Sequence, residues 1–299
     1  MWLSLAFLSA ALLGMYDFFK KVSLEKNAVI PVLFLNTLFG SLFFVPAVII
    51  SMVSPDTLRD TILYVPPIDW NTQLYLFIKA IIVLTSWLFT YFAMKHLPIT
   101  ITGPIRATQP ILVLLGALLI FGERLNLYQW IGVIIAISSF YLLSLSGKKE
   151  GIHFKNNKWV LFTIIATITG AISGLYDKYL LNSYDPMTVQ VWYTFYQFLI
   201  MTVILMVLWY PQRKNSSPFE WRWSILFISV FLCLADFVYF YALSEDGSMI
   251  SIVSMVRRSG VVVSFVCGAL FLREKNIKSK AIDMVLVLLG MFFLYLGTK

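Results

Sequence analysis

Ten long apolar segments constrain this chain more than any other feature of its sequence. They lie at about residues 2–20, 29–53, 73–94, 99–121, 126–145, 158–182, 187–209, 222–243, 248–271 and 279–297. An apolar run of about 18 residues or more is long enough to cross a hydrocarbon core about 30 Å thick as a helix. The sequence therefore predicts an all-α, multi-pass integral membrane protein with ten transmembrane helices. The loops between the segments are too short for a soluble domain.

Composition and charge support a membrane location. The chain is 60% hydrophobic and 13% charged, whereas soluble domains are about 45–50% apolar and about 25% charged. Its net charge of +8 comes mostly from basic residues in short loops, so we expect the lipid bilayer as its environment and no nucleic-acid partner. The first segment has neither a basic leader nor a small-residue cleavage site. We therefore expect it to be the first span and not a removable signal peptide.

The basic residues of the loops are distributed unevenly between the two sides of the membrane. One side holds Lys20, Lys21, Lys26, Lys95, Lys148, Lys149, Lys155, Lys158, Arg213, Lys214, Arg222, Arg273, Lys275, Lys278 and Lys280. The other side holds Arg59, Arg124, Lys178 and Lys299. Because basic loops stay in the cytoplasm, this count places both termini outside.

The two halves of the chain resemble each other. The string GMYD at 14–17 recurs as GLYD at 174–177, and residues 103–125 align with 254–276. This alignment places Arg106 on Arg257 and Glu123 on Glu274. We expect one five-helix repeat over 1–147 and a second over 148–299. Five is an odd number, so the second repeat enters the membrane in the opposite orientation, and such inverted repeats are typical of carriers that work by alternating access. The alternative is that duplication gives only a stable bundle.

The chain resembles the drug/metabolite transporter superfamily and, within it, the EamA-type exporters. The resemblance rests on the five-plus-five helices and on the segment GALLIFGERLNLYQWIGVIIAISSFYLL at 116–143. The second copy is degenerate because Arg273 replaces the glycine before Glu274. The resemblance implies a carrier for amino acids and related metabolites, for drugs, or for choline-like cations, with a central cavity lined by both halves. It also implies an N-terminus inside, opposite to the count of basic loops.

Four charged residues within the spans form two candidate pairs. Such residues cost about 2.5–3.5 kcal/mol each on insertion scales, so they normally face a cavity or a partner. Matching depths suggest that Asp17 pairs with Arg106 and that Asp177 pairs with Arg257. We expect these pairs to act as symmetry-related gates or to bind the charged ends of a zwitterion. The alternatives are pairing of Asp17 with Lys20 or Lys21 at helical spacing, and snorkelling of the basic side chains to the interface.

Further charges lie in the second half and in helix three. Asp236 has no obvious local counter-ion, although Lys79 could reach it from the other half. A carboxylate at this depth could hold a cationic substrate, accept a coupling proton, or belong to a structural polar network. Arg258 follows Arg257 directly but points about 100° around the helix, so we expect only one of the two to face the cavity.

Prolines and aromatic residues complete the candidate site. Pro104 and Pro110 flank Arg106 and Gln109, so we expect a bend there that frees carbonyl oxygens for a ligand, with simple packing as the alternative. Aromatic side chains in the middle of spans could stack on ring-bearing or quaternary ammonium substrates, or could simply pack in the core. These are Trp87, Tyr91, Trp192, Tyr193, Tyr196 and Tyr239.

No catalytic or metal-binding pattern is present in the sequence. His96 and His153 are its only histidines, Cys233 and Cys267 are its only cysteines, and no HExxH, GxSxG or Gly-rich phosphate loop occurs. We therefore expect no enzymatic activity, no metal and no cofactor. A passive channel is not favoured either, because no sequence resembling a selectivity filter occurs.

These observations predict a secondary active transporter of small metabolites in the plasma (inner) membrane. We expect export of amino acids or related zwitterions, because paired acids and bases could hold both charged ends. The alternative is a carrier of organic cations, such as choline-like compounds or cationic drugs, which would use Asp236 and the aromatic residues. The sequence agrees with coupling of transport to a proton or another ion. It also agrees with either a monomer or a homodimer.

Overall fold

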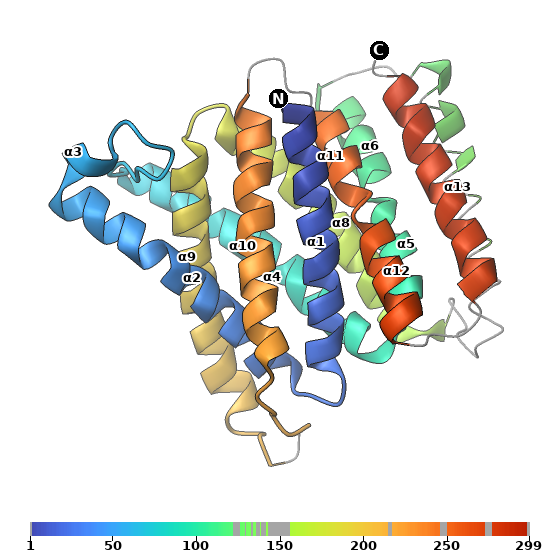
Figure 1. The fold of residues 1–299 in the computed structure, drawn as a ribbon, viewed down its shortest axis with the longest axis horizontal. Helices are drawn as coiled ribbons and strands as arrows, with labels where there is room; N and C mark the ends of the chain where they lie inside the picture. Colours follow the sequence, from blue (N-terminus) through green and yellow to red (C-terminus); the bar gives the residue numbers. More distant parts are fainter. Residues whose placement is uncertain are drawn as a thin grey trace.

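The computed structural model describes residues 2–121, 156–214, 217–245, 250–272 and 277–297. Between 122 and 155 it also describes residues 126–128, 130–132, 134, 135, 138 and 142. Every regular element within these residues is a helix (Figure 1). The expected all-α class is therefore confirmed for the described part of the chain.

Six helices are long and apolar enough to cross a membrane. They are α1 (Trp2–Leu24), α2 (Val29–Val53), α4 (Trp70–His96), α8 (Lys158–Leu181), α9 (Pro186–Ile204) with its π-helical continuation η2 (Leu205–Trp209), and α10 (Trp223–Ser244). A further helix, α13 (Ile277–Leu296), lies at the last expected span, and a single turn, α3 (Pro55–Leu58), follows α2.

The fourth and ninth expected spans are each broken into two helices. The fourth consists of α5 (Ile99–Ala107) and α6 (Gln109–Phe121), and the ninth of α11 (Ile250–Arg258) and α12 (Val261–Phe271). The bend expected between Pro104 and Pro110 is present, because α6 begins just before Pro110. The break in the ninth span was not predicted, since it lies at Ser259 and Gly260 without any proline.

The fifth expected span, 126–145, lies largely outside the described residues, so the count of ten helices stays a prediction. Glu123, Glu274 and Arg273 of the repeated motif also lie outside the described residues. The boundary expected between the two repeats, at 147 and 148, also lies outside the described residues.

Polar side chains fix the starts of three long helices. Asp69 precedes α4 and accepts a hydrogen bond from the Thr72 backbone nitrogen at 3.3 Å. Asn157 precedes α8 in the same way. Asp185 precedes α9, which has Pro186 at its first position. Such N-caps satisfy backbone N–H groups that have no partner within the helix, and proline fits the first turn because it has no N–H to satisfy.

The two halves interlock through their first and third long helices. Helix α1 packs along α10, and α8 packs along α4; Figure 1 shows α1 and α10 side by side at the front of the bundle. A serine hydroxyl joins each pair, Ser9 Oγ donating to the Ala235 carbonyl at 2.7 Å and Ser86 Oγ to the Ala166 carbonyl at 2.8 Å. The first helix of each half thus contacts the third long helix of the other half. This exchange gives two packed groups, α1 with α10, α11 and α12, and α8 with α4, α5 and α6.

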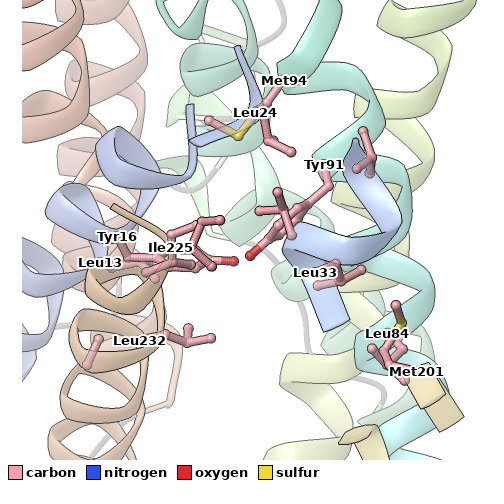
Figure 2. Packing of buried hydrophobic residues seen from close by; sticks show 14 of the residues in the cluster. Leu13, Tyr16, Leu24, Leu33, Leu84, Tyr91, Met94, Met201, Ile225 and Leu232 are labelled. Carbon is pink, nitrogen blue, oxygen red and sulfur yellow. The ribbon is translucent and has the colours of Figure 1, made fainter. Parts of the chain in front are cut away.

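The interior combines apolar packing with buried charges, and the outer surface is apolar. Leucine, isoleucine, methionine and tyrosine side chains of α1, α2, α4, α9 and α10 form the largest cluster (Figure 2). Lys20, Lys79 and Asp177 are buried, whereas Phe43 and Val203 are exposed. Charges inside and apolar groups outside are the arrangement that a lipid environment requires.

Helix α1 approaches the break of the ninth span closely. A Cβ atom at Gly14 would lie 2.4 Å from the Gly260 carbonyl oxygen, and a Cβ atom at Gly260 would lie 2.1 Å from the Ala10 carbonyl oxygen. Small residues allow such close approach of helix backbones in membranes. The two glycines therefore hold the α11–α12 junction against α1.

Candidate functional site

A polar cavity of about 90 Å³ lies inside the bundle, lined by α1, α4, α5, α6, α8, α9, α10 and α11. Its wall includes Arg106 and Gln109 from the first half and Asp177, Asp236 and Arg257 from the second. The cavity has room for a few water molecules. Ligand pockets are usually larger than about 300 Å³, so a metabolite requires the cavity to expand.

An ion pair joins α4 to α8 at this cavity. Lys79 Nζ donates to Asp177 Oδ1, and the two side chains are 3% and 9% exposed. The ammonium group also lies 4.7 Å from the centre of the Tyr193 ring. Asp177 was expected to pair with Arg257, and that expectation is wrong for this structure.

A second ion pair joins α10 to α11. Arg257 Nη2 donates to Asp236 Oδ1, and the Tyr193 hydroxyl donates to Asp236 Oδ2 at 2.7 Å. The Arg257 guanidinium lies 4.0 Å from the centre of the Tyr239 ring. Asp236 therefore has a counter-ion that the sequence did not reveal, and the expected contact with Lys79 is not formed.

The unequal charges of α4 and α10 explain the exchange of partners. Within its bounds α4 contains no acidic residue, and α10 contains no basic residue. Asp177 on α8 packs against α4 and forms an ion pair with Lys79. Arg257 lies beside α10 and forms an ion pair with Asp236. The depth of a residue in its helix does not indicate which neighbouring helix it faces.

A third cluster surrounds Asp17 on α1. Its carboxylate accepts from Arg106 Nη1 at 3.0 and 3.3 Å and from Lys20 Nζ at 2.5 Å. The expected contact between Asp17 and Arg106 is thus present, and so is the alternative contact with Lys20. Lys20 and Lys21 were counted with the basic residues of the loops, but both lie within α1, and Lys20 is 0% exposed. Its neighbour Lys21 donates to the Met94 and Leu97 carbonyls at 2.6 Å each.

Both consecutive arginines at the end of α11 face the cavity. Arg257 and Arg258 line the central cavity and also a smaller space beside Asp17, Arg106 and Gly103. The expectation that only one of the two faces inward is wrong. Helix α11 ends at Arg258, and the two spaces together extend around this end, so side chains 100° apart both reach them.

The other candidates divide into two groups. Gln109, Trp87 and Tyr239 line the cavity, and Gln109 lies against α8, where a Cβ atom at Gly170 would be 2.7 Å from its Oε1. Tyr91, Trp192 and Tyr196 do not line it.

Each residue of the second group has other neighbours. The Tyr91 hydroxyl points toward that of Tyr16 in the apolar cluster (Figure 2). The Tyr196 hydroxyl donates to Gln73 Oε1 at 3.1 Å, and its ring lies 6.5 Å from that of Trp192. These aromatic side chains therefore pack between helices.

Sequence reasoning offered the contact between Asp17 and Lys20 as an alternative, from their spacing of three residues, but missed the roles of Tyr193 and Arg258 at the cavity. No sequence signal indicated that Tyr193 reaches Asp236. Within the described residues, no group of three or more histidine, cysteine, aspartate or glutamate side chains is placed to hold a metal.

Comparisons with known proteins give a family match, a transporter relative and a similar fold. The model of the EamA-like transporter family matches residues 1–145 and 157–296. A protein of Archaeoglobus fulgidus described as an uncharacterized transporter is 26% identical over 248 residues, which cover 81% of this chain and 79% of that protein. A solved structure titled only as the crystal structure of a protein has a TM-score of 0.66 at 15% identity. It covers 99% of this chain and 98% of its own; at that identity, the likeness concerns the fold alone.

Proposed function

Because this chain belongs to the EamA-like transporter family, and is thus a membrane transporter, we propose that it exports amino acids or related zwitterions across the plasma membrane by alternating access. Membership of a transporter family also argues against an enzyme. The observation that carries the proposal is the internal cavity, which residues of both halves line with acids and bases together. A zwitterion presents one charge of each sign and therefore matches such a wall.

The ion pairs suggest how the cavity opens. Asp17–Arg106 connects the two packed groups of helices, because α1 belongs to one group and α5 to the other. Lys79–Asp177 and Asp236–Arg257 each stay within one group. Separation of the groups on the side of Asp17 therefore breaks only the first of these three pairs.

We propose that the opposite conformation exchanges partners. Asp17 keeps Lys20 when it releases Arg106, so its carboxylate stays paired. Asp177 on α8 and Arg257 on α11 are the counterparts of Asp17 and Arg106 in the repeat, and they belong to different groups of helices. A contact between them closes the other side in that conformation. A coupling proton or another cation would act on these buried carboxylates.

The alternative substrate class, organic cations, has less support. Cation-binding sites use open aromatic faces, but the rings of Tyr193 and Tyr239 are already occupied by Lys79 and Arg257. Asp236 is likewise engaged by Arg257 and Tyr193.

Counterflow in proteoliposomes tests transport directly. Liposomes that contain the purified protein and an unlabelled amino-acid mixture should transiently accumulate labelled amino acids from outside, whereas a channel gives no such accumulation. Protein-free liposomes are the control. Absence of counterflow for every amino acid would contradict the proposed substrate class. Efflux from preloaded cells and fractionation of their membranes test the direction of transport and the plasma-membrane location.

A further inference from the structure

The charged groups around the cavity do not balance. Among the described residues, five buried or half-buried cations surround it: Lys20, Lys79, Arg106, Arg257 and Arg258. Only three carboxylates accompany them, those of Asp17, Asp177 and Asp236. The cluster therefore carries a surplus of two positive charges within a membrane protein, where uncompensated charge is costly.

The surplus is located on one side of the cavity. Lys79 and Arg257 each have a carboxylate of their own. Lys20 and Arg106 share the single carboxylate of Asp17. Arg258 has no acidic side chain of the described residues within ion-pair distance and donates no hydrogen bond to any of them. Its electrostatic neighbours include two further cations, Arg106 and Arg257, and the carboxylate of Asp17, which is already shared by Lys20 and Arg106.

Arg258 faces interior space that must expand, as the central cavity must, to hold a ligand. Arg258 lines both the central cavity and the smaller space beside Asp17, Arg106 and Arg257. Gly103 and Ala107 form part of the wall of that smaller space. This wall is closely packed, because a Cβ atom at Gly103 would lie 2.6 Å from Val261 Cγ2. The Nε atom of Arg257, also at this end of α11, is buried and has no acceptor among the described residues. Two arginines with guanidinium donors that no described residue accepts thus line the same region.

We propose that this region binds the carboxylate or phosphate group of a substrate with net negative charge, held by Arg258 and Arg106. A guanidinium offers a planar fork of donors that matches both groups, and an anion there offsets the surplus charge. The inference rests on the proposed transport function and narrows its substrates to acidic amino acids and similar small organic anions. Neutral zwitterions and cations are then poor substrates.

Counterflow with four probes tests the inference in the full-length protein. L-glutamate and glycerol 3-phosphate supply the two kinds of anion, L-leucine a neutral zwitterion, and choline a cation. We expect exchange of at least one anion, and the pair of anions distinguishes carboxylate from phosphate recognition. Arg258→Gln should raise the KM for that anion by about tenfold or more. Arg59→Gln is the matched control, since it removes the same charge from an exposed arginine, and it should leave the KM unchanged.

The outcomes separate this inference from the proposed function. Exchange of L-leucine with no exchange of either anion would overturn the anion site and leave the transporter intact. Exchange of none of the four probes would contradict the anion site, while counterflow with the wider amino-acid mixture still decides the transport function. If Arg258→Gln does not fold, the inference is tested by the change in melting temperature of the wild-type protein when each probe is added. The exchanged anion must raise the melting temperature more than L-leucine does, and an equal or smaller rise would overturn the inference.

Discussion

At the scale of single residues, the ion pair between Lys79 and Asp177 predicts how substitutions change the stability of the protein. Removal of one partner leaves a buried charge without compensation, which costs about 3–5 kcal/mol in proteins, whereas replacement of both by apolar groups is often neutral. Lys79→Met should therefore destabilise the protein strongly, and Lys79→Met with Asp177→Leu should recover most of the loss. Thermal unfolding in detergent measures both, and strictly additive losses in the double variant would show that the two groups are not coupled.

The hydroxyl of Tyr193 supports a second prediction about a single side chain. It donates to the carboxylate of Asp236 at 2.7 Å, and hydrogen bonds to charged groups contribute about 1.5–3 kcal/mol. Tyr193→Phe keeps the ring beside Lys79 and removes only this bond, so stability should fall by an amount in that range. Tyr196→Phe is the control, because its hydroxyl bonds the neutral Gln73. An equal loss of melting temperature in both variants would contradict a specific role for the bond to Asp236.

Sequence reasoning predicted both contacts of Asp17 but neither the partner of Asp177 nor that of Arg257. Asp17 with Arg106, and Asp17 with Lys20, follow from depth and from helical spacing, and both contacts are present. The partners of Asp177 and Arg257 were wrong because depth along a helix does not define the direction in which a side chain points around it. That direction depends on which helices are neighbours.

At the scale of helices, the junction between α11 and α12 depends on close contact with α1. Gly14→Ala would place its Cβ 2.4 Å from the Gly260 carbonyl oxygen, and overpacking of this kind typically costs about 1–3 kcal/mol. The repeat supplies a matched control: Gly174, the counterpart of Gly14 in GLYD, has its nearest neighbour, Val113 Cγ2, at 3.9 Å. Gly14→Ala should lower the melting temperature and Gly174→Ala should not. Equal tolerance of both would mean that α1 does not pack against the junction this closely.

Helix boundaries were predictable where the sequence marks them. Prolines indicated the bend between α5 and α6, and the apolar segments indicated the long helices. The break at Ser259 and Gly260 carries no such marker, because glycine inside an apolar run is common in membrane helices. Only the approach of α1 to Gly260 shows why this glycine is needed.

At the scale of the whole molecule, the repeat in the sequence indicated two similar halves but not how they interlock. The pairing of α1 with α10 and of α8 with α4 requires the halves to exchange helices, and no pattern in the sequence encodes that exchange. For the proposed mechanism, this exchange means that the two packed groups of helices are not the two halves of the sequence. The orientation of these groups in the membrane stays a prediction: the count of basic residues places both termini outside, and the family resemblance places the N-terminus inside.

The proposed movement of these two groups gives a last prediction. Arg106→Gln removes the only described ion pair between them, so the side that Asp17 closes should open more often. A Ser173→Cys substitution on the cavity wall, in a background with Cys233→Ala and Cys267→Ala, reports this opening through reaction with a membrane-impermeant thiol reagent. Labelling should rise severalfold with Arg106→Gln and stay unchanged with Arg59→Gln. Equal labelling in both variants would mean that the Asp17–Arg106 pair does not hold the groups together, and the exchange of ion pairs would then not control access to the cavity.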